Sequence, residues 1–527
     1  MLILNRIRKL DHPQMYFWML LALAASLSLS KAFMSIFTGV LMGYWILKGQ
    51  FPAKFRLLKE RKSILLLISV FFVYLLGLLW TKSWEWGIHD LKIQLPLLLL
   101  PLVIGTSPVL NFNQVKKIIY FFSAAVVVSS FLSVLALFGF TFRTIHDPRQ
   151  ISLFISHIRF ALLINISIFS LGWYLLNQEQ KSRTEKILLM LAIVWLSIFL
   201  IILKSATGWV VFLIVLSVVT IIGILKIKKL VWRIVLLGAF FSIFLIPVVY
   251  SGYVYRQFYD VETLPNGFVH EKTTKGNSYE FDLTNKQLEN GHYVFYYINN
   301  DELRETWNKR SKLDYDFRTA SGFDNYVLYR YLTSKGYRKD AEGIEKLTND
   351  DIRNIENGMT NYRFVNSGSF YNRIYQIIWE VDFYQKGGNP SGHSVTQRLE
   401  YYKMAWQIIQ ENFWFGNGSG GYFAAYQEKY DQNKFFESQH FRQRSHNMFL
   451  SYWIDFGLFG LIYICFALAY PIFMERKTKS FLLMIFLLIV LISLMNEDTL
   501  NNHDAITFFS FFYPLYLYSQ ISLSTPK

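Results

Sequence analysis

Residues 118–140 read IIYFFSAAVVVSSFLSVLALFGF and contain no charged side chain. As an α-helix, this stretch is about 35 Å long, which exceeds the roughly 30 Å thickness of the hydrocarbon core of a bilayer. Residues 63–80 and 187–203 form similar uncharged runs. Because only helices and closed barrels satisfy their backbone groups in lipid, these runs predict a polytopic α-helical membrane protein.

Hydropathy along the whole chain predicts about twelve transmembrane helices. They cover residues 15–30, 32–47, 63–80, 91–105, 118–140, 158–176, 187–203, 208–225, 231–250, 447–474, 481–495 and 506–523. The ninth and tenth helices are separated by a long stretch rich in Tyr, Asn and charged residues, which cannot lie in lipid. The sequence therefore predicts three parts: transmembrane helices 1–9 in residues 1–250, a large loop domain in 251–446, and transmembrane helices 10–12 in 447–527.

The distribution of cations predicts the orientation. Alternate short loops carry clusters of Lys and Arg, whereas the loops between them carry isolated cations. The clusters are Arg6, Arg8 and Lys9; Lys48, Lys54, Arg56, Lys59, Arg61 and Lys62; Lys116 and Lys117; Lys181, Arg183 and Lys186; Lys226, Lys228, Lys229 and Arg233; and Arg476, Lys477 and Lys479. Since positive loops face the cytoplasm, the N-terminus is predicted to be cytoplasmic and the large loop to lie on the opposite face.

The large loop is predicted to be mainly helical, with one short β-hairpin. Residues 276–297 alternate polar and aromatic residues around Glu289-Asn290-Gly291, a turn signal. Helices are expected at 300–309, at 325–334, after Thr348, at 395–411 and at 422–430. Between the last two, the run Gly416-Asn-Gly-Ser-Gly-Gly421 is expected to be a flexible loop.

Composition limits the classes of function. The net charge of +16 is explained by the cytoplasmic loops, and no basic patch with interleaved aromatics indicates nucleic-acid binding. The single cysteine, Cys465, excludes an intrachain disulfide. We find no phosphate-binding glycine loop and no metal-ligand spacing, so neither a cofactor nor a metal is predicted.

One candidate site precedes the tenth predicted helix. The segment Arg442-Gln-Arg444-Ser-His446-Asn447 places two guanidinium groups and an imidazole at the positive end of a helix, where anions bind. An imidazole titrates near neutral pH, so His446 is a candidate general base. The alternative is an interfacial anchor.

Other candidates lie elsewhere in the chain. Arg398, in the first turn of the helix capped by Ser394, could bind a phosphate through paired donors or pair on the surface with Glu400 or Asp431. His157, Arg159 and Lys204 flank predicted helices on the outer face, where they could attract an anion or extend toward headgroups. Glu497 and Asp498, followed by His503 and Asp504, are candidates for binding acceptor hydroxyls; the alternative is that they only solvate a loop.

These residues resemble a known superfamily. RSHNMFLSYWIDFGLFGLI, preceded by an arginine-bearing helix and by FGNGSGGYF, is similar to the shared core of O-antigen ligases and O-antigen polymerases, as is a large loop after the ninth span. Residues 265–360 further look like a loop insertion of Bacteroidetes-type members.

The resemblance implies a GT-C-like fold in the bacterial inner membrane with a periplasmic loop. It implies a metal-independent, inverting glycosyltransferase with no cofactor that uses an undecaprenyl-diphosphate-linked glycan and acts in lipopolysaccharide biosynthesis. By position, His446 matches the histidine that activates the acceptor, and Arg398 and Arg159 match arginines that hold the diphosphate. Lys204 stands where many members have Ser-Arg, and a lysine does not supply the arginine fork.

Several functions stay open at this stage. A ligase acts on lipid A-core and a polymerase on the growing glycan, and the sequence does not separate them. A protein O-glycosyltransferase belongs to the same superfamily. From other classes, a polysaccharide flippase or transporter also has about twelve spans, and the loop could be the binding module of a membrane-anchored scaffold. The glycan and the oligomeric state are also left open.

Overall fold

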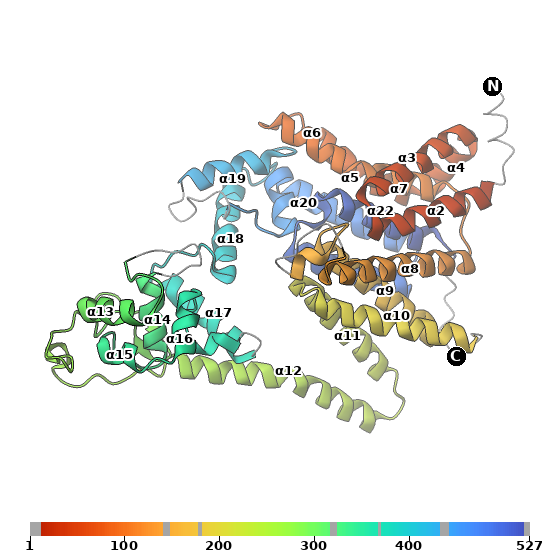
Figure 1. Cartoon of the computed structure of the whole chain (residues 1–527). Coiled ribbons are helices and arrows are strands. Elements are labelled where there is room, and N and C mark those ends of the chain that lie inside the picture. Colours follow the sequence, from red (N-terminus) through yellow and green to blue (C-terminus); the bar gives the residue numbers. More distant parts are fainter. Residues whose placement is uncertain are drawn as a thin grey trace. The chain divides into compact units, whose positions relative to one another are not determined.

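The computed structural model describes residues 12–140, 148–177, 182–316, 324–366, 370–432 and 442–520. Within these ranges the chain is mostly helical (Figure 1). By internal packing it divides into two units. The first unit comprises Met1–Gly223 together with Tyr401–Lys527, and the second comprises Ile224–Glu400.

The first unit is a bundle of apolar helices. Its elements are α2 (His12–Leu29), α3 (Lys31–Lys48), α4 (Phe51–Glu60), α5 (Lys62–Gly77), α6 (Trp84–Ile93), α7 (Leu95–Gly105), α8 (Phe112–Leu137), η1 (Pro148–Ile151), α9 (His157–Asn177), α10 (Arg183–Ile202), α11 (Ala206–Leu225), α19 (Gly421–Gln432), α20 (Met448–Met474), α21 (Phe481–Asn496), η5 (Thr499–Asn501) and α22 (His503–Tyr518). Within the described residues, each predicted apolar segment outside the second unit overlaps one of these helices or the consecutive pair α6 and α7.

Apolar helices of membrane-spanning length are numerous. Among the described residues, seven helices are long and apolar enough to cross a membrane, or eight if the bent pair α3 and α4 forms one span. Three shorter apolar helices, at Pro13–Leu29, Lys62–Gly77 and Phe481–Asn496, accompany them. The chain is therefore a polytopic helical membrane protein.

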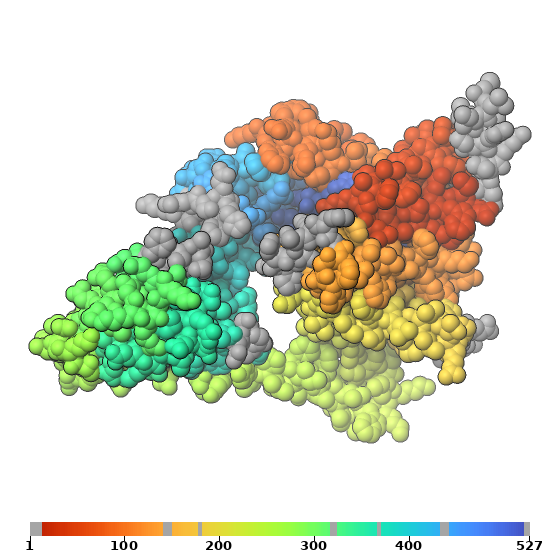
Figure 2. All heavy atoms as spheres, viewed as in Figure 1, coloured from red at the N-terminus to blue at the C-terminus, as the bar shows by residue number. Residues whose placement is uncertain are grey.

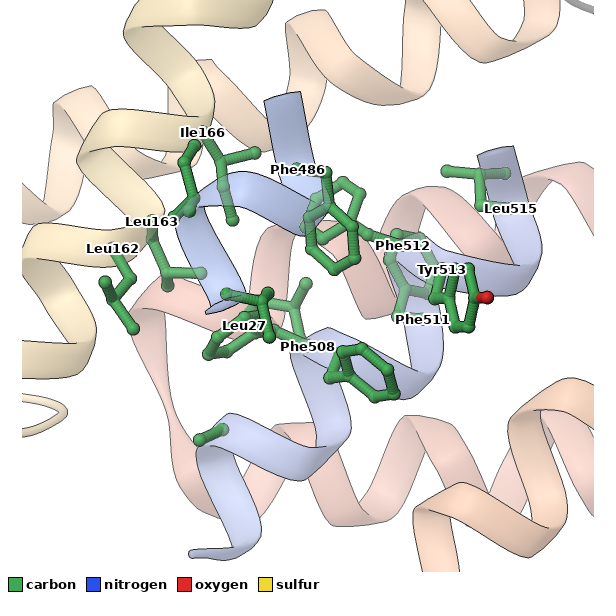
Figure 3. Close-up of a cluster of buried hydrophobic side chains, with 14 of the residues drawn as sticks. Leu27, Leu162, Leu163, Ile166, Phe486, Phe508, Phe511, Phe512, Tyr513 and Leu515 are labelled. Atoms are coloured by element: carbon green, nitrogen blue, oxygen red, sulfur yellow. The ribbon is translucent and has the colours of Figure 1, made fainter. Parts of the chain in front are cut away.

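Helix α22 forms the centre of the first unit. Every side chain from Asp504 to Tyr518 is buried, as expected for a helix that is apolar on all sides. It packs against α7, α21 and α2. Figure 3 shows its Phe508 and Phe512 among side chains of neighbouring helices, including Leu27 and Phe486.

A glycine-rich loop and a kinked helix interlock in the same unit. The chain of α20 leaves helical geometry at Gly457, where φ is +66° and ψ is −174°. The loop 413–421 packs beside this kink, where the amide of Gly418 donates to Asp455 O (2.8 Å). Ser419 is buried, and its amide and hydroxyl donate to the carbonyls of Gly77 (3.1 Å) and Tyr74 (2.5 Å). The expectation of a flexible loop was wrong, because backbone hydrogen bonds on two sides hold it.

The second unit combines one long apolar helix with a polar, aromatic domain. Its elements are α12 (Leu230–Phe258), η2 (Phe268–His270), β1 (Leu288–Glu289), β2 (His292–Tyr293), α13 (Asn300–Arg310), α14 (Asn325–Ser334), α15 (Ala341–Glu345), α16 (Asn349–Glu356), η3 (Tyr362–Asn366), α17 (Phe370–Gln385) and α18 (Ser394–Glu411), whose last turns belong to the first unit. Trp307 is the largest fully buried side chain here. Figure 2 shows the atoms of this domain in green and turquoise.

A buried ion pair joins three elements of this domain. The guanidinium of Arg330 on α14 lies 2.8 Å from the carboxylate of Glu289 on β1. Asn361 donates a second hydrogen bond to Glu289 (2.6 Å), and Arg330 stacks over the Trp379 ring at 3.8 Å. Because both charges are paired and hydrogen-bonded, the low-dielectric interior tolerates them.

The β-hairpin was correctly placed but is shorter than predicted. Strands β1 and β2 pair antiparallel across Asn290-Gly291, whose φ angles are +51° and +85°. Ile298 instead forms bridges to Glu280 and to Lys339. Helices α13, α14, α16, α18 and α19 lie where the sequence predicted them, whereas α15 and α17 were missed.

Candidate functional site

The segment 442–447 leads directly into α20. Asn447 caps this helix, since its side-chain oxygen accepts from the amides of Phe449 (3.0 Å) and Leu450 (3.2 Å). Its amide nitrogen donates to Met495 O at the end of α21 (3.3 Å). Asn447 therefore fixes the start of α20 and positions the residue before it.

His446 lies at that position in an unusual backbone conformation. Its φ angle is +51°, in the left-handed region that non-glycine residues seldom occupy. The imidazole Nδ1 lies 3.5 Å from the Glu497 carboxylate, which is 14% exposed. Glu497 follows α21, so two segments far apart in sequence bring a base and a carboxylate together. The sequence suggested both residues but not their pairing.

Two arginines precede His446 and have different surroundings. The guanidinium of Arg444 lies over the Tyr422 ring of α19 at 4.2 Å. Arg442 instead pairs with Asp431 at 2.7 Å, a carboxylate that is 61% exposed. Arg444 is thus held by an aromatic face and keeps a positive charge beside His446, whereas the charge of Arg442 is already paired.

Asp498, next to Glu497, is buried against α20. It accepts a hydrogen bond from the Ser451 hydroxyl (2.6 Å). Burial raises the pKa of Asp498, and the Ser451 hydrogen bond and the charges of Arg444 and His446 only partly offset this effect. Asp498 therefore interacts electrostatically with Arg444 and His446 from a buried position.

A second charged group surrounds Asp504 at the start of α22. Its carboxylate lies 3.6 Å from Arg159 Nε on α9 and 3.7 Å from Lys31 Nζ on α3. Arg159 also donates to the Ser156 hydroxyl (2.9 Å). Arg159 is therefore held by Asp504. Glu497 and Asp504 lie at opposite ends of the short segment 497–504.

The remaining sequence candidates are less constrained. His157 opens α9 and is half-buried. Lys204 is exposed at the turn between α10 and α11 with a φ angle of +50°. In the part of the chain that the structure describes, we find no ion pair of Lys204. The next residue, Ser205, caps α11 through the amide of Gly208 (3.3 Å).

Arg398 lies in the second unit, on the first turns of α18, and is exposed. Of the two suggested surface partners, Glu400 accepts from Tyr384, and Asp431 pairs with Arg442. Its convergence with His446 and Arg159 stays a prediction, because those residues belong to the other unit.

Sequence reasoning overlooked Asp455, which lies inside α20. It is 1% exposed, and its Oδ1 accepts from the amide of Tyr422 at the start of α19 (3.0 Å). This bond fixes α19 and with it the ring under Arg444. The signal was present in the sequence, since a carboxylate within an apolar run is rare and marks a specific role.

Chemically, the arrangement can accept a proton and stabilise an anion. The Glu497 carboxylate lies 3.5 Å from one ring nitrogen of His446, where it can orient the imidazole. Arg444 and the positive end of α20 favour a nearby negative charge. Among the described residues, no three His, Cys, Asp or Glu side chains lie close enough to ligate one metal ion.

Comparison with known proteins gives one finding. No curated protein matches the chain. The model of the O-antigen ligase family matches residues 364–465, a segment that includes Arg398, Arg442, Arg444, His446 and Asn447. Over this segment the chain is similar to the O-antigen ligase family, which supports membership of the O-antigen ligase superfamily.

Proposed function

We propose that the chain is an O-antigen ligase that transfers a glycan from undecaprenyl diphosphate to a sugar hydroxyl of lipid A-core. In this proposal about twelve helices span the bacterial inner membrane in a GT-C-like arrangement, and residues 251–446 lie in the periplasm. The observation that carries the proposal is the pairing of His446 with Glu497 at 3.5 Å, at the start of a helix and within the segment that matches the family.

The reaction is a single displacement with inversion. The acceptor hydroxyl attacks the anomeric carbon, its proton passes to Nε2 of His446, and the bond to the diphosphate oxygen breaks. Glu497, at Nδ1, orients the ring and stabilises the imidazolium that forms. The leaving undecaprenyl diphosphate takes the electron pair, and Arg159, Arg398 and Arg444 neutralise its charge. Positioning and charge stabilisation suffice, because the diphosphate is already an activated leaving group. No metal or cofactor takes part in this scheme.

The test replaces His446 with alanine and compares it with a matched control. His270→Ala removes an exposed histidine of η2 in the second unit. Each purified variant, in lipid nanodiscs, receives undecaprenyl-diphosphate glycan and lipid A-core, and the product is resolved by electrophoresis. We expect His446→Ala to lower the rate by roughly 10²–10⁴-fold, the usual contribution of a general base, and His270→Ala to retain it.

Deletion of the gene distinguishes the related functions. Full-length glycan that accumulates on undecaprenyl diphosphate supports a ligase, whereas single repeat units indicate a polymerase. Accumulation of neither would contradict transfer from this lipid. Normal activity of His446→Ala would overturn the role of His446.

A further inference from the structure

A pocket of about 170 Å³ lies within the second unit, separate from the residues assigned above. Residues from three segments line it: 262–265, then 292, 293 and 297, and then 333 and 336–339. A single buried water needs about 10–15 Å³ measured in this way, and pockets for drug-sized ligands begin near 300 Å³. The pocket therefore has room for one small group, about the size of a sugar ring.

Backbone hydrogen bonds between the three segments form the walls. The amide of Lys339 donates to Tyr297 O (3.0 Å), and the amide of Glu262 donates to Gly291 O (3.0 Å). Tyr297 adopts a φ angle of +56°, a conformation that is strained for a bulky residue. Such strain persists only where the surrounding structure enforces it, and it concentrates at binding sites. The pocket is thus a built feature of this domain.

Glu262 supplies acceptor oxygens to the pocket. Its carboxylate lies 2.7 Å from Nδ1 of His292 and accepts from the amide of Tyr293 (3.3 Å). Although burial acts in the opposite direction, the hydrogen bond and charge of His292 lower the pKa of Glu262. The carboxylate is therefore ionised at neutral pH and is 30% exposed, so a ligand can reach it.

Lys339 and Arg338 supply donors. Lys339 Nζ donates to Tyr293 O and to the Thr333 hydroxyl, both at 3.1 Å, which accounts for two of the three hydrogens of an ammonium group. Burial lowers the pKa of Lys339 to about 7. Arg338 pairs with Glu271, and its guanidinium stacks over the Tyr297 ring at 4.3 Å.

This combination selects against simple ions. A phosphate or other anion would approach the ionised Glu262, and a cation would approach the Arg338 guanidinium. A neutral polyol avoids both penalties, because its hydroxyls donate to the carboxylate and accept from the N–H groups of Arg338 and Lys339. Tyr293, which is half-buried, adds aromatic surface, against which the C–H face of a pyranose ring can pack.

We propose that this pocket binds one neutral sugar ring of a glycan chain. The inference deepens the proposed function. It rests on that function only for the identification of the glycan as donor or acceptor. Binding itself requires no transfer, so it can be measured separately from catalysis. The pocket would hold the glycan at a ring other than the one that reacts, and so favour substrates that carry the matching sugar.

The experiment measures sugar binding to the full chain in nanodiscs by saturation-transfer NMR at pH 7. The probes are the methyl glycosides of a neutral hexose, an N-acetylhexosamine and a hexuronic acid, together with inorganic phosphate as a competitor. The pocket variants are Glu262→Gln and Arg338→Gln. Matched controls are Glu305→Gln and Arg353→Gln, whose side chains are 57% and 71% exposed and lie outside the pocket.

We expect a neutral glycoside to bind the wild type, both controls and His446→Ala alike. Each pocket variant should weaken binding by about tenfold or more, the effect of losing one hydrogen bond to a charged group. Melting temperatures equal to the wild type establish that the pocket variants are folded. Binding that is unchanged in both pocket variants, an absence of any sugar binding, or displacement by phosphate would each overturn the inference. Binding without transfer activity would uphold it and refute only the proposed function.

Discussion

Substitution of Gly457 by alanine should disturb the whole region that leads to the candidate site. At φ +66° and ψ −174° the backbone is in a region that is accessible essentially to glycine alone, at a cost to other residues of about 1–3 kcal/mol. An added Cβ would also overlap the backbone of Trp414 and Phe415. Because backbone atoms cannot rotate away as a flexible side chain can, the loop 413–421 must shift.

The hydrogen bonds between α20 and the loop 413–421 determine how strongly Gly457→Ala destabilises the protein. The amide of Leu458 donates to Phe413 O (2.9 Å), and the amide of Gly418 donates to Asp455 O (2.8 Å). At about 1 kcal/mol for each bond, their loss brings the expected destabilisation to about 3–5 kcal/mol. The same shift would move Asp455, and with it α19 and the ring under Arg444.

The assay is thermal stability in detergent, followed by size-exclusion chromatography, with glycan transfer measured in parallel. The control is Gly43→Ala in α3, where an added Cβ meets no atom within 4 Å and the helix should gain slightly. We expect Gly457→Ala to lower both melting temperature and transfer, and Gly43→Ala to lower neither. A Gly457→Ala protein with unchanged melting and transfer would refute the view that glycine is required at the kink.

Two further substitutions test other contacts. Glu497→Gln should slow glycan transfer by roughly 10–100-fold, because a charge-assisted contact worth about 1.5–3 kcal/mol is lost while the base, His446, remains. This effect is smaller than the upper end of the range expected for His446→Ala. Equal transfer rates for Glu497→Gln and the wild type in the nanodisc assay would exclude the pairing from catalysis. Asp351→Asn should destabilise the second unit at pH 7. Although burial acts in the opposite direction, hydrogen bonds from Lys335, Tyr331 and Thr348 lower the pKa of Asp351 from 3.8 to about 2. The carboxylate therefore contributes about 2 kcal/mol, which is fully present above pH 3.8 and lost as the pH falls through about 2. Faster hydrogen exchange of the α16 amides in the variant checks this, and identical exchange at pH 7 would contradict it.

The sequence predicted the helices well because their signal is local. Charge-free runs of membrane length became helices, and Thr348 caps α16 as expected. Helix α17 was missed although Tyr371, Tyr375 and Ile378 recur along it at helical spacing. Its role depends on partners distant in sequence, since Tyr375 and Trp379 pack with Val254 and Phe258 of α12.

The candidate site could be predicted only as residue types. His446 and Glu497 were both recognised, but their pairing depends on how α20 and α21 meet. The glycine-rich loop gives a similar lesson. Many glycines in one segment are typical of flexibility, yet here they permit close approach of backbones: a Cβ at Gly418 would lie 2.6 Å from Gly77 O. Sequence composition does not distinguish the two cases, because the contacting chain lies far away.

The carboxylate of Asp504 has a consequence for turnover. It already lies 3.6 and 3.7 Å from Arg159 and Lys31 and offsets one of their two positive charges, in a position only 5% exposed. If Arg159 receives the diphosphate, the incoming anion must compete with this internal counter-ion. Affinity for the lipid carrier is then lower than an unopposed arginine would give, and the spent carrier is released more readily as the carboxylate resumes its contact.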